Sequence, residues 1–226
     1  MPPRSLIVAI DGPSGAGKGT VARTVAARLA YPYVDTGAMY RAVAWKALRD
    51  GVDLTNAADV AALARGSTFD LDTRTRIDGH DVTSAIRPPA LDDAAAIVAR
   101  HPDVRAVLVE RQRRYGVEGG LVMEGRDIGS VVFPTADVKI YLDALPEERA
   151  RRRAVDTAHA AGRDASPVEH VAQALEARDL SDRTRAISPL TRAADAVYID
   201  TTGMAVEAVV TRVMAIVAAR QTPGTD

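Results

Sequence analysis

Apolar segments of two kinds alternate along the chain and predict strands and helices in turn. Residues 6–10 form a continuous apolar run, which is the pattern of a central parallel strand buried on both faces. Short apolar runs predict further strands at residues 33–34, 121–123, 138–142 and 197–200. Helical spacing or composition predicts helices at residues 20–30, 37–49, 57–64, 92–100, 103–115 and 206–220. Two more are predicted between them, one that begins at residue 146 and another that ends at about residue 183. This alternation predicts an α/β fold with a doubly wound parallel sheet.

One segment departs from this alternation. Residues 68–72 and 76–83 have the pattern of short strands, the second of which contains an Asp-Gly turn at Asp78 and Gly79. Pro88 and Pro89 then interrupt the chain before the next two helices. We therefore expect a small antiparallel insertion within the α/β pattern.

Composition favours a single cytoplasmic domain and argues against several classes of protein. The chain has 226 residues, 47% of them apolar, which is enough to bury a sizeable core. Its 29 basic and 30 acidic residues argue against binding to nucleic acid or to a membrane surface. The absence of cysteine excludes disulfides and a thiol nucleophile, and four scattered histidines argue against a histidine metal site. The apolar segment 206–219 carries Glu207 and Arg212, so we expect no membrane span.

Arginine dominates the basic residues, because the only lysines are Lys18, Lys46 and Lys139. A coding bias explains this pattern, and so does a site that grips planar or phosphorylated groups with guanidinium forks. The two explanations are compatible.

A glycine-rich loop follows the first predicted strand. Residues 12–18 fit the pattern G-x-x-x-x-G-K between a buried strand and a helix, which is the context that this phosphate-binding motif requires. Its backbone N–H groups and the helix N-terminus favour phosphate, and Lys18 supplies a mobile positive charge. The expected nucleotide-binding residues are Gly12, Pro13, Ser14, Gly15, Ala16, Gly17, Lys18, Gly19 and Thr20.

The loop departs from the usual motif in one place. Gly19 stands where Ser or Thr commonly follows the lysine to touch Mg²⁺, and Thr20 comes next. This ending resembles nucleoside monophosphate kinases more than regulatory GTPases. Ser14 is either a small loop residue or a ligand whose hydroxyl and N–H face the phosphate.

A second half of the site is expected at the ends of two other strands, where open α/β sheets bind ligands. In the segment 35–41, Thr36 is either only a helix N-cap or also a contact to a ligand. Arg41 lies one turn further on and either reaches a substrate phosphate or is solvated. In the segment 124–129, glycines flank Arg126 and Asp127, which form either a ligand site or a structural pair.

The segment 178–185 has alternating charges, which usually mark a solvated helix face. The spacing of seven residues between Arg178 and Arg185 returns both to one side of a helix, with Asp182 between them. We therefore keep both interpretations of this segment, as a surface face and as part of the site.

Together these motifs resemble the bacterial cytidylate kinase family. The matching segments are IDGPSGAGKGT (10–20), VDTGAMYR (34–41), EGRDIGSVVFP (124–134), VKIYLDA (138–144), RDLSDRTRAISPL (178–190) and ADAVYIDTT (194–202). They extend from the first to the last predicted strand. The resemblance implies a monomeric enzyme that phosphorylates CMP or dCMP from ATP with Mg²⁺. It also implies one P-loop kinase domain over residues 1–226, with a monophosphate-binding insertion at about 37–100 and a helical lid at about 149–166.

The resemblance further implies a role for individual residues. Ser14, Arg41, Arg126 and Arg185 would hold the acceptor phosphate, and Arg178 and Asp182 would contact the sugar hydroxyls. Arg105 and Asp127 would contact the cytosine edge, with Thr36 nearby. The catalytic group would comprise Lys18, Arg126, Arg185 and the lid residues Arg151 and Arg153, with no metal ligated directly by the protein. The sequence departs from the family at Ala96, where a pocket serine is common.

Two other functions remain open at this stage. One is a kinase for UMP, AMP or a small hydroxy acid, and the other is a nucleotide-dependent switch that binds without transferring a phosphoryl group. The sequence contains no Asn-Lys-x-Asp guanine signature. If the chain is a kinase, the acceptor phosphate oxygen is itself the nucleophile, so alignment and charge neutralisation are sufficient and no catalytic base is needed.

Overall fold

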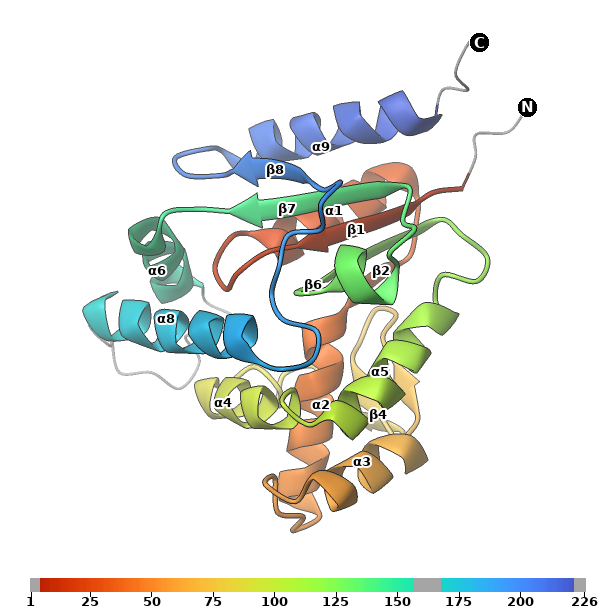
Figure 1. The fold of residues 1–226 in the computed structure, drawn as a ribbon, viewed down its shortest axis with the longest axis vertical. Helices are drawn as coiled ribbons and strands as arrows, with labels where there is room; N and C mark the ends of the chain where they lie inside the picture. The colour runs from red at the N-terminus through yellow and green to blue at the C-terminus, as the bar shows by residue number, and fades with distance from the viewer. Residues whose placement is uncertain (1–4, 157–167, 222–226) are drawn as a thin grey trace.

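Five parallel strands form the central sheet of the protein, in the order β2–β6–β1–β7–β8 (Figure 1). The structure is a computed structural model that describes residues 5–156 and 168–221. The strands are β1 (Ile7–Asp11), β2 (Tyr33–Asp35), β6 (Leu121–Gly125), β7 (Val138–Asp143) and β8 (Val197–Asp200). The predicted doubly wound parallel sheet is confirmed.

Helices cover both faces of this sheet, because successive side chains of each strand point to opposite sides. In β1, Val8 and Ile10 pack with α1 (Lys18–Leu29) and α9 (Val206–Gln221). Ala9 points the other way, into a core formed with α2 (Thr36–Arg49), α3 (Ala57–Gly66) and α5 (Pro102–Arg114). The two apolar faces explain why the strand sequences are continuously apolar rather than alternating.

Three further helices border the carboxyl ends of the strands. α6 (Pro146–Val155) packs against α8 (Val168–Thr184), and α4 (Pro89–Val98) packs against α2 (Figure 1). α4 begins at Pro89 rather than at the predicted residue 92, since proline is well suited to the first turn of a helix.

A π-helical turn, η1 (Ile128–Val132), follows β6 directly. This turn was not predicted, because a single π-turn leaves no periodic pattern in the sequence. Turns of this kind are rare and occur frequently at functional sites.

The small antiparallel segment predicted around residues 68–83 is also present. It consists of β3 (Phe69–Asp70), β4 (Arg76–Ile77) and β5 (His80–Asp81). Asp78 and Gly79 join β4 to β5 with φ angles of 49° and 78°, as a two-residue hairpin turn requires. Ile77 is fully buried against Ala38 and Ala42 of α2, which attaches this sheet to the rest of the domain.

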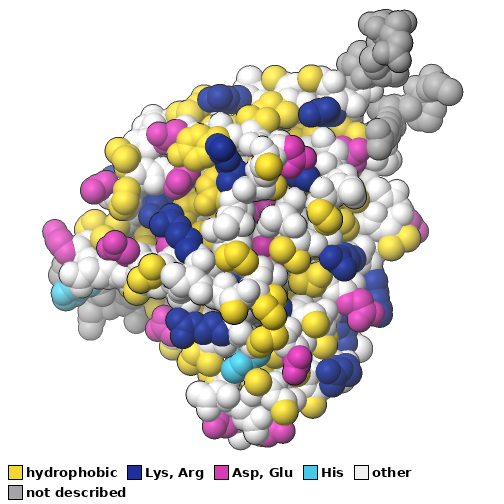
Figure 2. Space-filling model, viewed as in Figure 1, with side chains coloured by type: hydrophobic (Ala, Val, Ile, Leu, Met, Phe, Trp, Pro, Cys, Tyr) yellow, Lys and Arg dark blue, Asp and Glu magenta, His cyan; other side chains and the backbone are white. Residues whose placement is uncertain are grey.

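Basic and acidic side chains are mixed over the surface in the view of Figure 2, in agreement with a net charge of −1. The helices within residues 5–156 and 168–221 include none that is both long enough and apolar enough to span a bilayer.

Candidate active site

The phosphate loop connects β1 to α1, and its glycines are required by close packing. A Cβ atom on Gly12 would lie 2.0 Å from the Leu142 carbonyl oxygen, and one on Gly15 would lie 2.8 Å from the Arg149 carbonyl oxygen. Gly15 and Gly17 also have φ angles of 78° and 88°, which strain other residues. Glycine-rich loops of this kind can bind anions with their backbone N–H groups.

Lys18 lies in the first turn of α1 and is buried, and its Nζ donates a hydrogen bond to the Pro13 carbonyl oxygen at 2.8 Å. Burial and the neighbouring Arg126 charge together lower the pKa of Lys18 to about 7, although Glu124 opposes this shift. An anion bound in the loop would favour the charged form of Lys18. Lys18 is therefore well suited to bind a phosphate group.

Two charged residues fix the loop from outside. Arg149 of α6 and Asp179 of α8 form a buried ion pair. Arg149 Nη1 donates to the Ser14 carbonyl oxygen at 3.0 Å, and the Ser14 N–H donates to Asp179 Oδ1 at 3.0 Å. The expectation that the Ser14 N–H faces the phosphate is therefore wrong, because Asp179 already accepts this hydrogen bond. The Ser14 hydroxyl does face the site, where it accepts from Arg126 at 2.7 Å.

Two carboxylates lie across from Lys18, at the ends of β6 and β2. Glu124 accepts a hydrogen bond from the Tyr33 hydroxyl at 3.0 Å, and burial and the neighbouring Asp35 raise its pKa. Asp35 is half-buried, which raises its pKa, but Arg41 and the Ala38 N–H outweigh this effect and hold the pKa below its usual value. A Cβ atom on Gly19 would lie 2.9 Å from Glu124 Oε1, so glycine at this position leaves the carboxylate accessible from the loop.

The start of α2 corrects one interpretation of the sequence. The N-cap is Asp35, which accepts from the Ala38 N–H at 3.0 Å. Thr36 is instead the first helical residue, and its hydroxyl donates to the Glu124 carbonyl oxygen at 2.7 Å. Thr36 is therefore not a cap but ties α2 to the end of β6.

Arg41 is buried one turn into α2, so the interpretation of Arg41 as a solvated residue is wrong. Its Nη2 atom donates to Asp35 at 2.9 Å, and its Nη1 atom lies 4.0 Å from Asp92. The guanidinium lines the same cavity as the phosphate loop.

Arg126 and Asp127 are adjacent in sequence but each pairs with another residue, so a structural pair between them is not formed. Arg126 Nε donates to Asp182 at 2.9 Å. Asp127 forms a buried ion pair with Arg105 of α5, and Arg185 Nη2 lies 3.8 Å from its other oxygen. The loop therefore separates an arginine that faces the phosphate loop from a carboxylate that faces α5.

Asp11, at the end of β1, holds this second loop in place. Its two carboxylate oxygens accept hydrogen bonds from the N–H groups of Ile128 and Gly129, each at 2.8 Å. Burial raises the pKa of Asp11 to about 6 although these two hydrogen bonds lower it. The residue that precedes the phosphate loop thus positions the segment that carries Arg126 and Asp127.

Arg178, Asp182 and Arg185, at the end of α8, lie on a side of the helix that faces inward, so their interpretation as a solvated surface is wrong. Asp182 is buried and accepts from Arg126 and from Arg185, whose Nη1 atom is 3.2 Å away. Arg178 Nη1 lies 3.1 Å from Asp92 of α4. Asp182 therefore joins the two arginines that were expected to hold the same phosphate.

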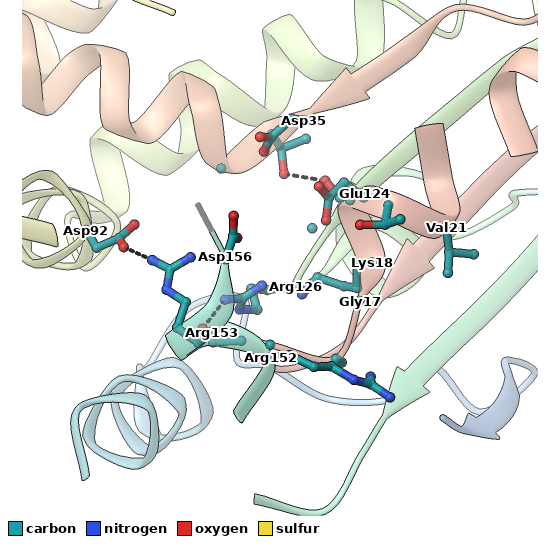
Figure 3. Close-up of a pocket in the computed structure, with 18 of the residues that line it drawn as sticks. Gly17, Lys18, Val21, Asp35, Asp92, Glu124, Arg126, Arg152, Arg153 and Asp156 are labelled. Carbon is teal, nitrogen blue, oxygen red and sulfur yellow. Dashed lines mark hydrogen bonds and ion pairs between the residues drawn. The ribbon is translucent and has the colours of Figure 1, made fainter. Parts of the chain in front are cut away.

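The arginines of α6 differ in their surroundings. Arg149 is buried in the ion pair described above. Arg151 is 63% exposed and pairs with Glu148, while Arg153 extends from α6 to Asp92 of α4 (Figure 3). Residues 157–166 of the expected lid lie outside the described residues.

A single cavity of about 800 Å³ brings the two halves of the site together. Its lining includes most of the residues that we expected from the sequence, with Ala96 on α4 among them. These are Ser14, Gly15, Ala16, Gly17, Lys18, Gly19, Thr20, Thr36, Arg41, Arg105, Arg126, Asp127, Arg151, Arg153, Arg178, Asp182 and Arg185. Such a volume is typical of a site for small molecules.

Five carboxylates in or beside the site were not predicted from the sequence: Asp11, Asp35, Asp92, Glu124 and Asp179. Asp11, Asp35 and Glu124 each lie at the carboxyl end of a predicted strand, which was the available signal. Asp92 and Asp179 lie within helices that carry other charges, so their burial could not be inferred from spacing.

The chain is similar to known proteins in sequence and in fold. The sequence model of the family described as cytidylate kinase matches residues 8–219. The chain is 51% identical over 218 residues to a cytidylate kinase of Pelotomaculum thermopropionicum, covering 94% of this chain and 96% of that protein. It is 48% identical over 217 residues to a cytidylate kinase of Desulfitobacterium hafniense, covering 94% and 93% respectively. A solved gluconokinase of Sinorhizobium meliloti is similar in fold, with a TM-score of 0.50 at 14% identity over 96% of this chain and 93% of that one.

Proposed function

The chain belongs to the cytidylate kinase family and is a kinase, and from this premise we propose that it transfers the γ-phosphoryl group of ATP to CMP or dCMP. The products are ADP and CDP or dCDP. The observation that carries the proposal is the single cavity in which the phosphate loop faces a group of buried arginines. A donor and an acceptor that are both phosphorylated need two such cationic surfaces in one enclosed space.

In the proposed reaction, an oxygen of the CMP phosphate forms a bond to the γ-phosphorus of ATP. The bond from that phosphorus to the β–γ bridging oxygen breaks, and ADP leaves with the electron pair. The attacking oxygen is already ionised at neutral pH, so the protein supplies alignment and charge rather than a base. Lys18 and the loop N–H groups hold the donor phosphates, and Arg41, Arg126 and Arg185 hold the acceptor phosphate.

The acceptor phosphate would replace the Asp182 carboxylate as the hydrogen-bond partner of Arg126 and Arg185. Arg126 and Arg185 share Asp182, so both point into the same region before the substrate arrives. A phosphate monoester has enough oxygens to accept from both arginines and from the Ser14 hydroxyl. Preorganisation of this kind reduces the cost of binding.

The cytosine ring is proposed to lie beside Arg105 and Asp127. A carboxylate accepts a hydrogen bond from the N4 amino group of cytosine, and a guanidinium donates to N3 and O2. Arg105 and Asp127 are buried together and line the cavity, and Thr36 lies nearby. Ala96 contributes no polar group, so the sugar would depend on Arg178 and Asp182.

Mg²⁺ is proposed to bind with the ATP phosphates. The residues present fit such an ion, because Glu124 and Asp35 line the cavity and Gly19 leaves the Glu124 carboxylate accessible from the loop. When bound, Mg²⁺ would neutralise phosphate charge and favour in-line geometry. Glu124 and Asp35 would hold its coordinated water molecules rather than the ion itself.

The domain organisation is part of the proposal. Residues 1–226 form one kinase domain in which the segment 37–100 holds the monophosphate and the segment 149–166 forms a lid. In the described part of that lid, Arg151 and Arg153 line the cavity and would contact the transferred phosphoryl group. Exclusion of water is needed because ATP would otherwise be hydrolysed.

The test is a coupled assay of ADP release in the presence of CMP, dCMP, UMP, AMP or shikimate, with CDP and dCDP identified by chromatography. We expect the highest kcat/KM with CMP or dCMP. Preference for another acceptor would assign the chain a different substrate. Tight binding of nucleotide without transfer to any acceptor would contradict the proposal.

A further inference from the structure

Asp92 lies in the first turn of α4 and is 7% exposed. Its helix neighbours in the cavity lining are Ala95 and Ala96, so Asp92 is the only charged side chain that α4 contributes to this lining. The cavity is proposed to bind two anionic nucleotides, whose phosphates a carboxylate repels. The position of Asp92 therefore calls for a role other than contact with phosphate.

Arginines from three different helices approach Asp92. Arg153 of α6 forms an ion pair and hydrogen bond with Asp92 Oδ2, which Figure 3 marks with a dashed line. Arg178 of α8 lies 3.1 Å from Asp92 Oδ1, and Arg41 of α2 lies 4.0 Å from the same oxygen. The carboxylate thus joins the acceptor side of the site to α6 and α8.

The electrostatics of Arg153 depend on this carboxylate. Burial lowers the pKa of Arg153, Asp92 raises it, and the nearby positive charges of Arg178 and Arg41 lower it again. The Arg153 side chain is only 15% exposed, so water screens this repulsion poorly. Without Asp92, the guanidinium would move away from the other two arginines or towards solvent.

We propose that Asp92 is a positioning residue that holds Arg153 on the acceptor side of the cavity, facing the phosphoryl group during transfer. This inference rests on the proposed function. Asp92 acts through Arg153 and does not itself touch the substrate. Its loss therefore lowers kcat more than it raises the KM for CMP.

The test compares the wild type with Asp92→Asn, Arg153→Gln and the double variant in CDP formation at saturating ATP and CMP. A misplacement of about 1 Å in a reacting group can cost a hundredfold, so we expect kcat to fall by about ten- to a hundredfold in Asp92→Asn. Arg153→Gln should fall at least as far, and the double variant should match Arg153→Gln alone. The KM for CMP should change by less than about threefold in Asp92→Asn.

Asp93→Asn is the matched control, because Asp93 is the next residue of α4 and is exposed. It should retain the kcat of the wild type. Asp92→Glu keeps the negative charge and should recover most of the lost kcat. All rates are compared at a temperature at which thermal unfolding shows every variant to be folded.

Three results would overturn the proposal. They are a kcat of Asp92→Asn within twofold of the wild type, losses that multiply in the double variant, and a raised KM for CMP with unchanged kcat. The last would place Asp92 with Arg178 in the binding of the sugar. Absence of CDP formation by the wild type would instead overturn the proposed function, so the two failures are distinguishable.

Discussion

Arg149 and Asp179 form a buried ion pair that hydrogen bonds to both backbone groups of Ser14 in the phosphate loop. Arg149 contacts the Ser14 carbonyl oxygen, and Asp179 contacts the Ser14 N–H. The loop conformation thus depends on α6 and α8, which follow it by more than a hundred residues. A loop tied in this way is preorganised for phosphate before any nucleotide binds.

The Asp179→Asn variant should lower the free energy of unfolding by about 3–5 kcal/mol, since it leaves the Arg149 charge buried without its carboxylate. The KM for ATP should also rise because Ser14 loses a fixed partner. Urea denaturation and steady-state kinetics measure the two effects. Glu176→Gln, on an exposed part of the same helix, should change neither. A stability within 1 kcal/mol of the wild type would show that the pair is weak.

The Lys18→Ala variant should lower kcat by about a hundredfold to a thousandfold or more, because Lys18 supplies charge where it develops in the transition state. Its fold should remain intact, because among the described residues the Lys18 side chain donates its hydrogen bond to Pro13, within the same loop. Initial rates and circular dichroism measure these outcomes. Lys46→Ala is the control, since Lys46 pairs with Asp50 and Asp78 instead. A loss of less than tenfold would mean that the active site is elsewhere.

The sequence predicted the sheet because the central strands β1, β6 and β7 are buried on both faces and are therefore mostly apolar. It predicted the phosphate loop because glycines, lysine, strand and helix are adjacent in the chain. The partners of individual charges could not be predicted in this way. Arg126 pairs with Asp182, 56 residues later, and Asp11 binds the backbone 117 residues later. Only the packing of β1, β6 and α8 brings these groups together.

The same limit explains the errors at Thr36 and Ser14. A threonine at the start of a helix is a good N-cap by propensity, but Asp35 precedes it and takes that position. The Ser14 N–H was expected to face phosphate because loops of this type commonly direct their N–H groups inward. Asp179, on a helix far away in the sequence, accepts the hydrogen bond of the Ser14 N–H, so this group does not face the phosphate. Local patterns gave the right segments, and tertiary contacts decided the roles within them.

Stability should depend on pH through Asp11. The pKa of this carboxyl is raised from 3.8 to about 6 by burial, so the folded protein retains a proton that the unfolded chain releases. Stability from this group is present below pH 3.8 and is lost as the pH rises through about 6, with a total change of about 3 kcal/mol. Urea denaturation between pH 4 and 7 should therefore show wild type losing stability relative to Asp11→Asn. Asp93→Asn should follow the wild type, and parallel profiles for wild type and Asp11→Asn would refute the prediction.

The Asp182→Asn variant should raise the KM for both CMP and dCMP and should also lower kcat. Burial raises the pKa of Asp182, but Arg126 and Arg185 outweigh this and keep it below its usual value, so the group is ionised at neutral pH. Its loss releases the two arginines proposed to hold the acceptor phosphate. Steady-state kinetics with each nucleotide separate the two effects. A change in KM without a change in kcat would limit Asp182 to the sugar hydroxyls.

The Asp127→Asn variant should shift the specificity from CMP towards UMP. Uracil presents a carbonyl where cytosine presents an amino group, so it sets an acceptor against the Asp127 carboxylate. An unpaired buried polar group costs about 1–3 kcal/mol, which is about tenfold to over a hundredfold in the CMP/UMP ratio of kcat/KM. The asparagine amide donates to the uracil carbonyl and removes this penalty. The ratio is measured by competition between the two nucleotides.

Asp127 also pairs with Arg105 and lies 3.8 Å from Arg185, so the substitution affects these two arginines as well as the base. Asparagine keeps the size of the side chain but weakens both contacts, so kcat/KM for CMP should fall while that for UMP rises or falls less. Asp103→Asn, at the exposed start of the same helix as Arg105, should leave the ratio unchanged. If Asp127→Asn reduces activity on both nucleotides equally, Asp127 does not discriminate between the bases. Its role would then be to hold Arg105 and Arg185 in the orientation that the phosphate requires.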